Sequence, residues 1–236
     1  MIISADANAL EVRAVAFLSQ DEVLMDELRN GVDIHTANQH KLGLPDRGIA
    51  KVFKFRTIYG GNEYSFANDP NFSGISSSTK FWKDVLDKYF SKYKGMALWH
   101  NKLIRQVVNN KGVLEMPYGR SYQFKKFDGS YKDTQIKNFP VQGLGADIMA
   151  IARVSAYNRI KKLGYGDKCL FVNTVHDSLI LDVDEKVCDN NIIVETLHSV
   201  FEDVPKNFEK LFGIEFNVPM KAECQIGTNW KDMKVI

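Results

Sequence analysis

The sequence predicts an α+β fold in which strands joined by tight turns are combined with long helices. Two observations support this prediction. Short apolar runs, typical of strands, occur at the start and in the second half of the chain, and two of them are separated by only two polar residues. Long stretches with helical periodicity fill much of the remainder, without an internal repeat or a low-complexity tract.

The first half of the chain begins with a strand and continues mainly as helices. A short buried strand is expected at residues 2–5, and it ends at Asp6. Asp21 and Asp33 have the side chains that cap helix N-termini. The helical stretches are expected at residues 10–17, 21–28, 33 onward, 47–59 and 79–109, the last interrupted at Gly95; residues 68–78 are expected to form a loop and residues 112–124 a hairpin.

The second half is expected to supply most of the sheet. A helix is predicted at residues 133–163, with an irregularity near Pro140. Two β-rich runs follow at residues 169–175 and 178–183, and the short separation between them predicts a tight hairpin with polar residues at its tip. The chain is then expected to form a helix at residues 185–201 and strand-like segments at residues 216–226.

Length and composition exclude several classes of protein. The chain has 236 residues, of which 44% are hydrophobic and 25% are charged, so it has room for one large domain or two small ones with a real core. No apolar run approaches the roughly 20 residues that span a bilayer, and the acidic start is unlike a signal peptide. Three cysteines without metal-type spacing indicate reduced thiols. We therefore expect a cytoplasmic protein without a membrane partner.

The net charge of +2 conceals an uneven distribution along the chain. Residues 80–132 contain twelve Lys and Arg against four acidic residues, a net charge of +8, and residues 41–60 contain five against one, a net charge of +4. The two ends of the chain are acidic. A basic middle suggests a polyanionic partner, and a solvated face that favours solubility is the alternative.

Two carboxylates lie where they could act together. Asp6 ends an apolar strand, and Asp177 lies at the tip of an apolar hairpin, so both would meet at one edge if these strands share a sheet. Carboxylates held together need a cation, and hard oxygen ligands suit Mg²⁺. The alternatives are a helix N-cap for Asp6 and a turn residue for Asp177.

A stripe of side chains on the predicted helix at residues 47–59 suits a nucleoside triphosphate. Its residues are four apart, so on a helix they form one slowly turning line roughly 18 Å long. Cations would meet the phosphates and aromatic rings the sugar and base. The alternative is an amphipathic helix with a basic rim and aromatic core contacts. The stripe is Arg47, Lys51, Phe55 and Tyr59.

With these residues in place, the chain resembles the polymerase module of family A DNA polymerases, the group of bacterial DNA polymerase I and related phage enzymes. Three motifs occur in the family's order, at residues 6–13, 47–60 and 175–177. The resemblance implies an incomplete right-hand polymerase fold, an antiparallel palm sheet with a helical fingers subdomain. The palm would comprise residues 1–30 and 133–236, and the fingers, with the DNA-contacting helices and hairpin after them, residues 31–132.

The resemblance also implies the activity and the roles of single residues. The chain would add dNTPs to a primer 3′-hydroxyl on a DNA template, with two Mg²⁺ ions held by Asp6, Asp177 and the backbone carbonyl of Ala7. Glu11 with Tyr59 would exclude a ribonucleotide 2′-hydroxyl, and Lys51 would donate a proton to pyrophosphate. The dNTP-binding residues would be Ala7, Glu11, His35, Arg47, Lys51, Phe55 and Tyr59, and the residues that contact primer–template DNA would be Arg120, Asn138, Gln142 and His176.

Several residues depart from the family pattern, Ser178 and Arg56 among them, and other functions stay open. Ser178 replaces a glutamate that often follows the second aspartate, and Arg56 replaces a frequent glycine. Only five residues precede Asp6, so we expect a split, phage-derived polymerase in the host cytoplasm, whose thumb and 3′→5′ exonuclease lie on a separate chain. A truncated fragment is the alternative. Whether its synthesis serves replication or repair stays open. A catalytically silent DNA-binding subunit is the second function considered, and Glu11 disfavours a single-subunit RNA polymerase.

Overall fold

The computed structural model describes residues 1–236, which divide into two compact units. The sheet unit comprises residues 1–13 and 143–236, and the helical unit comprises residues 14–142. The boundaries between them fall inside helices α1 (Leu10–Ser19) and α8 (Asp133–Lys162). The assignment of palm and fingers to residues 1–30, 31–132 and 133–236 stays a prediction.

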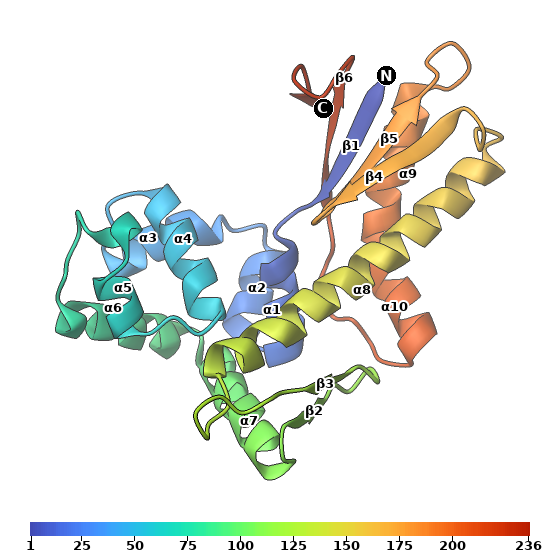
Figure 1. Cartoon of the computed structure of the whole chain (residues 1–236). Helices are drawn as coiled ribbons and strands as arrows, with labels where there is room; N and C mark the ends of the chain where they lie inside the picture. The colour runs from blue at the N-terminus through green and yellow to red at the C-terminus, as the bar shows by residue number, and fades with distance from the viewer. The chain divides into compact units, whose positions relative to one another are not determined.

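The sheet unit contains a five-stranded antiparallel sheet with the strand order β4-β5-β1-β6-β7 (Figure 1). The first strand of the chain therefore lies in the middle, between strands that come from the C-terminal third. The predicted α+β fold is confirmed. The strands are β1 (Ile2–Ala7), β4 (Cys169–Val175), β5 (Ser178–Val183), β6 (Ala222–Gly227) and β7 (Lys234–Val235).

Strand β1 has one face in the core and one face outside it. Ile3, Ala5 and Ala7 are fully buried, and helix α9 (Asn190–Glu202) contacts both β1 and β6. Successive side chains of a strand point to opposite faces, so the even-numbered residues of β1 point away from this core. Asp6 lies on that second face, where it is half-buried.

The tight hairpin is confirmed. Strands β4 and β5 pair with Val175 opposite Ser178, which leaves only His176 and Asp177 in the turn. His176 has a φ of +51°, in the left-handed region that a two-residue turn uses and that costs a residue with a side chain some strain. This turn places Asp177 at the tip of the hairpin.

The second half of the chain differs from the sequence prediction in four ways. Helix α9 begins at Asn190 rather than at residue 185, because Asp189 caps it by accepting hydrogen bonds from two backbone N–H groups. A further helix, α10 (Val204–Phe212), was not predicted. Strand β6 is shorter than the expected range, and α8 runs unbroken through Pro140.

The helical unit contains most of the predicted helices and one small sheet. Asp21 and Asp33 cap their helices as expected, and residues 68–78, expected to be a loop, contain a short 3-10 turn at Pro70–Phe72. A short helix at Glu63–Ala67, which was not predicted, precedes this region. None of the helices combines the length and apolar character that crossing a membrane requires. The elements are α2 (Glu22–Arg29), α3 (Ile34–Leu42), α4 (Arg47–Ile58), α5 (Glu63–Ala67), α6 (Thr79–Lys92), α7 (Lys94–Asn109), β2 (Val113–Glu115) and β3 (Ser121–Gln123).

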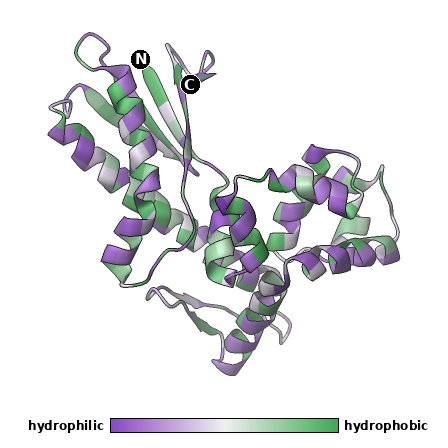
Figure 2. Cartoon of the chain, turned by 180° about the vertical axis from the view of Figure 1, so that it is seen from behind, coloured by the Kyte–Doolittle hydropathy of each residue, from purple (hydrophilic) through white to green (hydrophobic).

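A cluster of buried aromatic rings holds α4 in the helical unit. Phe53 of α4 lies 4.8 Å from the ring of Phe66 and 5.6 Å from that of Tyr89, and Trp82 lies 5.4 Å from Phe66. All four residues are almost completely buried. The helices mix hydrophobic and hydrophilic residues (Figure 2), so each can turn an apolar side to such a core.

Arg56, which departs from the family's glycine, has a structural partner. It forms an ion pair with Asp69, whose side chain is only 2% exposed, and its guanidinium lies 5.9 Å from the centre of the Phe72 ring. Asp69 also accepts a hydrogen bond from the backbone N–H of Asn71 at 2.9 Å. Arg56 therefore neutralises a buried carboxylate that organises the chain after α5.

We predict that Arg56→Ala lowers the free energy of unfolding by about 2 kcal/mol, because it leaves the Asp69 carboxylate buried without its cation. The matched control is Lys83→Ala, which breaks the Lys83–Asp87 ion pair between side chains that are 63% and 65% exposed. That pair is expected to contribute less than about 0.5 kcal/mol. Urea denaturation measures both variants, and equal effects would contradict the role given to Arg56.

Candidate functional site

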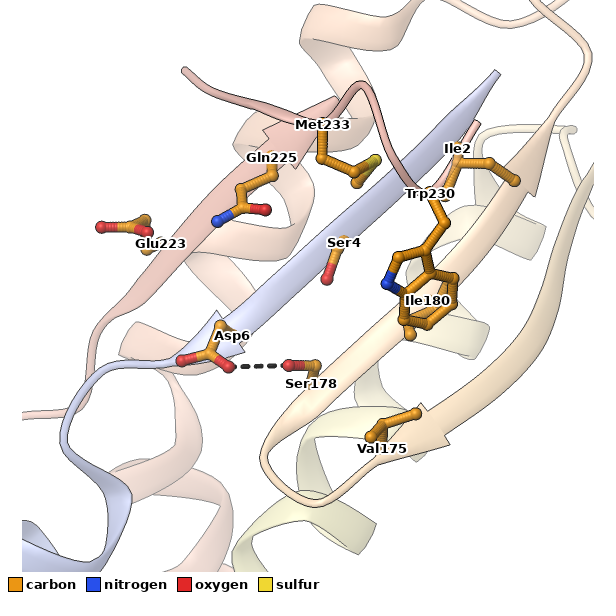
Figure 3. Close-up of a pocket in the computed structure, with 10 residues that line it drawn as sticks. All are labelled: Ile2, Ser4, Asp6, Val175, Ser178, Ile180, Glu223, Gln225, Trp230 and Met233. Atoms are coloured by element: carbon orange, nitrogen blue, oxygen red, sulfur yellow. Dashed lines mark hydrogen bonds between the residues drawn. The ribbon is translucent and has the colours of Figure 1, made fainter. Parts of the chain in front are cut away.

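Asp6 lies at the end of β1 between two neighbouring strands. Its partners in the sheet register are Ser178 on β5 and Glu223 on β6. The Ser178 hydroxyl donates a hydrogen bond to Asp6 Oδ2 at 2.7 Å (Figure 3). Asp6 is therefore a strand residue and not a helix cap, and one of its carboxylate oxygens is held by the hairpin strand.

Asp177 lies beside Asp6. The backbone N–H of Ala7 donates to the carbonyl of Asp177 at 2.8 Å, which fixes the hairpin tip to the end of β1. Burial raises the pKa of the Asp177 carboxyl, and the negative charges of Asp6 and Glu11 raise it further. A hydrogen bond with the Asp6 side chain, which needs a proton, acts in the same direction. The structure thus brings together the two carboxylates that the sequence singled out.

The chemistry of this carboxylate pair fits a hard divalent cation. Two carboxylates in contact repel each other when both are ionised, and Mg²⁺ prefers oxygen ligands and usually keeps several waters. No cluster of three or more His, Cys, Asp or Glu side chains has the arrangement of a metal site, so the protein ligands offered here are the two carboxylates and neighbouring backbone oxygens. Ala7 follows Asp6 at the end of the same strand.

A pocket of about 370 Å³ adjoins Asp6 on the open face of the sheet (Figure 3). Its floor is formed by alternate residues of β1, β5 and β6, and Trp230 and Met233 from the C-terminal segment line it as well. It contains carboxylates but no Lys or Arg. The lining residues are Ile2, Ser4, Asp6, Val175, Ser178, Ile180, Glu223, Gln225, Trp230 and Met233.

The predicted stripe on α4 lies on the outer side of that helix. Arg47 and Lys51 are exposed, and Phe55 is half-buried, whereas Phe53 and Ile58 on the other side are fully buried. The two exposed cations and the half-buried Phe55 fit both the nucleotide-binding stripe and the alternative of a basic rim with aromatic core contacts, so the role of the stripe stays a prediction. Tyr59 follows the last residue of the helix as its C-cap.

Arg47 has an acidic partner within the helical unit. Its Nε donates to Asp33 Oδ2 at 2.7 Å, and both side chains are about half exposed. Asp33 also caps α3 by accepting from the backbone N–H groups of His35 and Thr36. The hydrogen bond from Arg47 holds the pKa of Asp33 well below its usual range. An incoming phosphate would compete with this carboxylate for the guanidinium.

His35 lies close to the same cations. Burial, together with the positive charges of Lys54 and Arg47, lowers its pKa to about 4. The imidazole is therefore neutral at pH 7, and its ring centre lies 6.2 Å from that of Phe55. A neutral His35 can donate one N–H to a phosphate but does not add a charge.

Tyr59 and Gln142 are brought together inside the helical unit. The Gln142 side-chain amide donates to the Tyr59 hydroxyl at 2.8 Å. Asn138 lies one turn before Gln142 on α8, so the two amides share one side of the helix. A residue predicted to bind the nucleotide is thereby linked to one predicted to contact DNA.

The other predicted residues fall into the two units separately. His176 is exposed at the hairpin tip of the sheet unit, and Glu11 lies in the first turn of α1 in the same unit. Arg120 is exposed in the turn before β3 of the helical unit. Sequence reasoning missed Ser178 and Glu223 as neighbours of Asp6. Their proximity depends on the strand register, which no local pattern encodes.

Comparisons with known proteins identify the family of the chain. The sequence profile described as DNA polymerase family A matches residues 1–232. The chain is 26% identical to DNA polymerase I of Lactococcus lactis subsp. lactis and 26% identical to that of Caldicellulosiruptor bescii, in each case over 99% of this chain. The chain belongs to DNA polymerase family A.

A solved structure with a similar fold is the POL domain of Pol1 from M. smegmatis in complex with DNA primer-template and dNTP. The TM-score is 0.80 at 21% sequence identity, and the match covers 97% of this chain and 40% of that chain. The chain spans about a quarter of the length of the two DNA polymerase I relatives, at 26% and 27%. The right-hand polymerase fold, in part, is confirmed.

We predict that Asp177→Asn raises the free energy of unfolding of the metal-free chain at pH 7 by about 1 kcal/mol. This is the order of the repulsion energy between two like charges on neighbouring strands. The pKa of Asp177 is higher in the folded than in the unfolded chain, so folded-state stability falls as the pH rises from about 4 through the raised pKa. Asparagine removes this loss.

Urea denaturation in EDTA at pH 7 and pH 4 measures this effect. The advantage of Asp177→Asn should shrink at pH 4, where a larger fraction of the Asp177 carboxyl is protonated and uncharged. Asp167→Asn, an exposed acid before β4, is the control and should change stability by less than about 0.5 kcal/mol. Loss of stability in Asp177→Asn at pH 7 would contradict the proximity of the carboxylates.

Proposed function

We propose that this chain is the catalytic part of a template-directed DNA polymerase, which adds dNTPs to a primer 3′-hydroxyl. The observation that carries the proposal is the contact between Asp6 and Asp177 at the edge of the sheet, in a chain that belongs to DNA polymerase family A. A DNA-binding subunit without activity has no need of two carboxylates in contact. The neighbour of similar fold was solved with DNA primer-template and dNTP, which supports these substrates.

Asp6, Asp177 and the carbonyl of Ala7 would hold two Mg²⁺ ions. When bound, Mg²⁺ supplies Lewis-acid stabilisation of negative charge at the reacting oxygens. The chain itself keeps the two carboxylates close to each other. The Ala7 N–H donates a hydrogen bond to the Asp177 carbonyl in the hairpin turn, and the Ser178 hydroxyl donates one to Asp6. Because the pKa of Asp177 is raised, protonation of this carboxyl competes with cation binding.

The outer stripe of α4 would bind the triphosphate. Arg47 would exchange its bond to Asp33 for a phosphate oxygen, and the exposed Lys51 would add a second positive charge and donate a proton to the leaving pyrophosphate. His35 would contribute a neutral N–H, because its pKa of about 4 leaves it uncharged. Phe55 would lie against the deoxyribose.

The remaining residues would select the sugar and hold the DNA. Glu11 and Tyr59 would leave no room for a 2′-hydroxyl, and Tyr59 is already oriented by Gln142. The primer–template contacts would come from Arg120, Asn138, Gln142 and His176. The expectation that a separate chain carries the thumb and exonuclease stays a prediction, which primer extension with and without a candidate partner chain would test.

We predict that Asp6→Asn lowers the rate of single-nucleotide primer extension by at least about 100-fold, because loss of a metal ligand removes several kcal/mol of transition-state stabilisation. Binding of duplex DNA, measured by fluorescence anisotropy, should survive. Asp167→Asn is the matched control with unchanged rate. Normal extension by Asp6→Asn would contradict the assignment of the metal ligand, and a wild-type chain that extends no primer, alone or with a partner chain, would contradict the proposed activity.

We predict that Glu11→Ala relaxes sugar discrimination, because the space for a 2′-hydroxyl opens beside the nucleotide. The ratio of kcat/KM for dNTP over rNTP should fall by about 10- to 100-fold, the effect of 1–3 kcal/mol. Single-turnover incorporation of each nucleotide measures this ratio. An unchanged ratio would remove Glu11 from the sugar gate while leaving the metal ligands untouched.

A further inference from the structure

We propose that Ser178 is a positioning residue, whose hydroxyl holds the Asp6 carboxylate in the orientation that binds the divalent cation. The inference rests on the proposed metal site at Asp6 and Asp177. Ser178 occupies a position where related chains often have glutamate, so the sequence alone suggested a lost acid. In the structure, the Ser178 hydroxyl is instead a hydrogen-bond donor to Asp6.

Two hydrogen bonds join the end of β1 to the β4–β5 hairpin. The Ser178 hydroxyl donates to Asp6 Oδ2 at 2.7 Å, and the backbone N–H of Ala7 donates to the Asp177 carbonyl at 2.8 Å. The first bond fixes a side chain and the second fixes the turn. Together they fix the Asp6 carboxylate and the backbone that carries the Asp177 carboxylate.

The charges around Asp6 make a neutral donor valuable at this position. Glu223 is its partner on β6, and both Asp6 and Glu11 lie close enough to Asp177 for their negative charges to raise the pKa of that carboxyl. All of these side chains accept hydrogen bonds when ionised, and the pocket beside them has no Lys or Arg. Ser178 supplies a proton donor where a glutamate would add another negative charge.

Holding one oxygen of Asp6 has a consequence for the other. An O–H···O⁻ bond of this length is charge-assisted, so it restricts rotation of the carboxylate. The second oxygen then needs less ordering when a cation arrives. Residues that orient metal ligands through hydrogen bonds typically contribute 10- to 100-fold to metal affinity.

The test is cation binding by the full 236-residue chain, measured with Mn²⁺ by the loss of the free-ion EPR signal and with Mg²⁺ by competition. Ser178→Ala should weaken binding about tenfold. Ser178→Thr keeps the hydroxyl and should restore the wild-type affinity. The matched control is Ser4→Ala, which removes a hydroxyl from the same face of the sheet but opposite Ile180 and Gln225 rather than an acid.

The outcomes separate this inference from the metal site itself. If Asp6→Asn and the wild type bind Mn²⁺ equally, the metal site is wrong. If Asp6→Asn loses binding while Ser178→Ala keeps the wild-type affinity, the metal site stands and the role of Ser178 is overturned. Urea denaturation of Ser178→Ala checks that the chain is folded, and equal loss in Ser178→Thr would also overturn the proposal.

Discussion

The antiparallel pairing of β1 with β5 is the constraint on which the candidate site depends. Asp6 and Asp177 are 171 positions apart in sequence, and only this register places Ser178 opposite Asp6 and the Asp177 carbonyl opposite the Ala7 N–H. A slip of one residue would turn Asp6 into the core and bring Ala5 or Ala7 to the open face. The buried face of β1 prevents that slip, since an ionised carboxylate there would have no partner.

Charged groups in both units already have partners inside the chain. In the sheet unit the Ser178 hydroxyl holds one oxygen of Asp6, and in the helical unit Asp33 holds the guanidinium of Arg47. The Ser178 hydroxyl presents positive charge to Asp6, as a metal cation would, and Asp33 presents negative charge to Arg47, as a phosphate would. Such contacts keep reactive side chains ordered before substrate arrives, at the cost that a phosphate must displace the Asp33 carboxylate.

The sequence allowed the hairpin, the α4 helix and both carboxylates to be predicted, because a two-residue polar gap and a four-residue stripe are local signals. It did not reveal the register, so Ser178 was interpreted as a lost acid. Arg56 likewise stood out only as a departure from the family's glycine. Its ion pair with the buried Asp69 depends on the turn after α5, which local propensity does not predict. Helix α10 was missed although Pro205 in its first turn and Gly213 at its end are recognisable boundary signals.

The most direct test of the account is where a cation binds on the chain. Backbone amide NMR signals recorded during titration with Mn²⁺ report proximity to the paramagnetic ion. The account predicts that the signals of Ala7, Asp177 and Ser178 broaden first and together, and that Asp177→Asn abolishes this broadening. Broadening that begins elsewhere, or that affects only one of the two strands, would contradict a site built from both carboxylates.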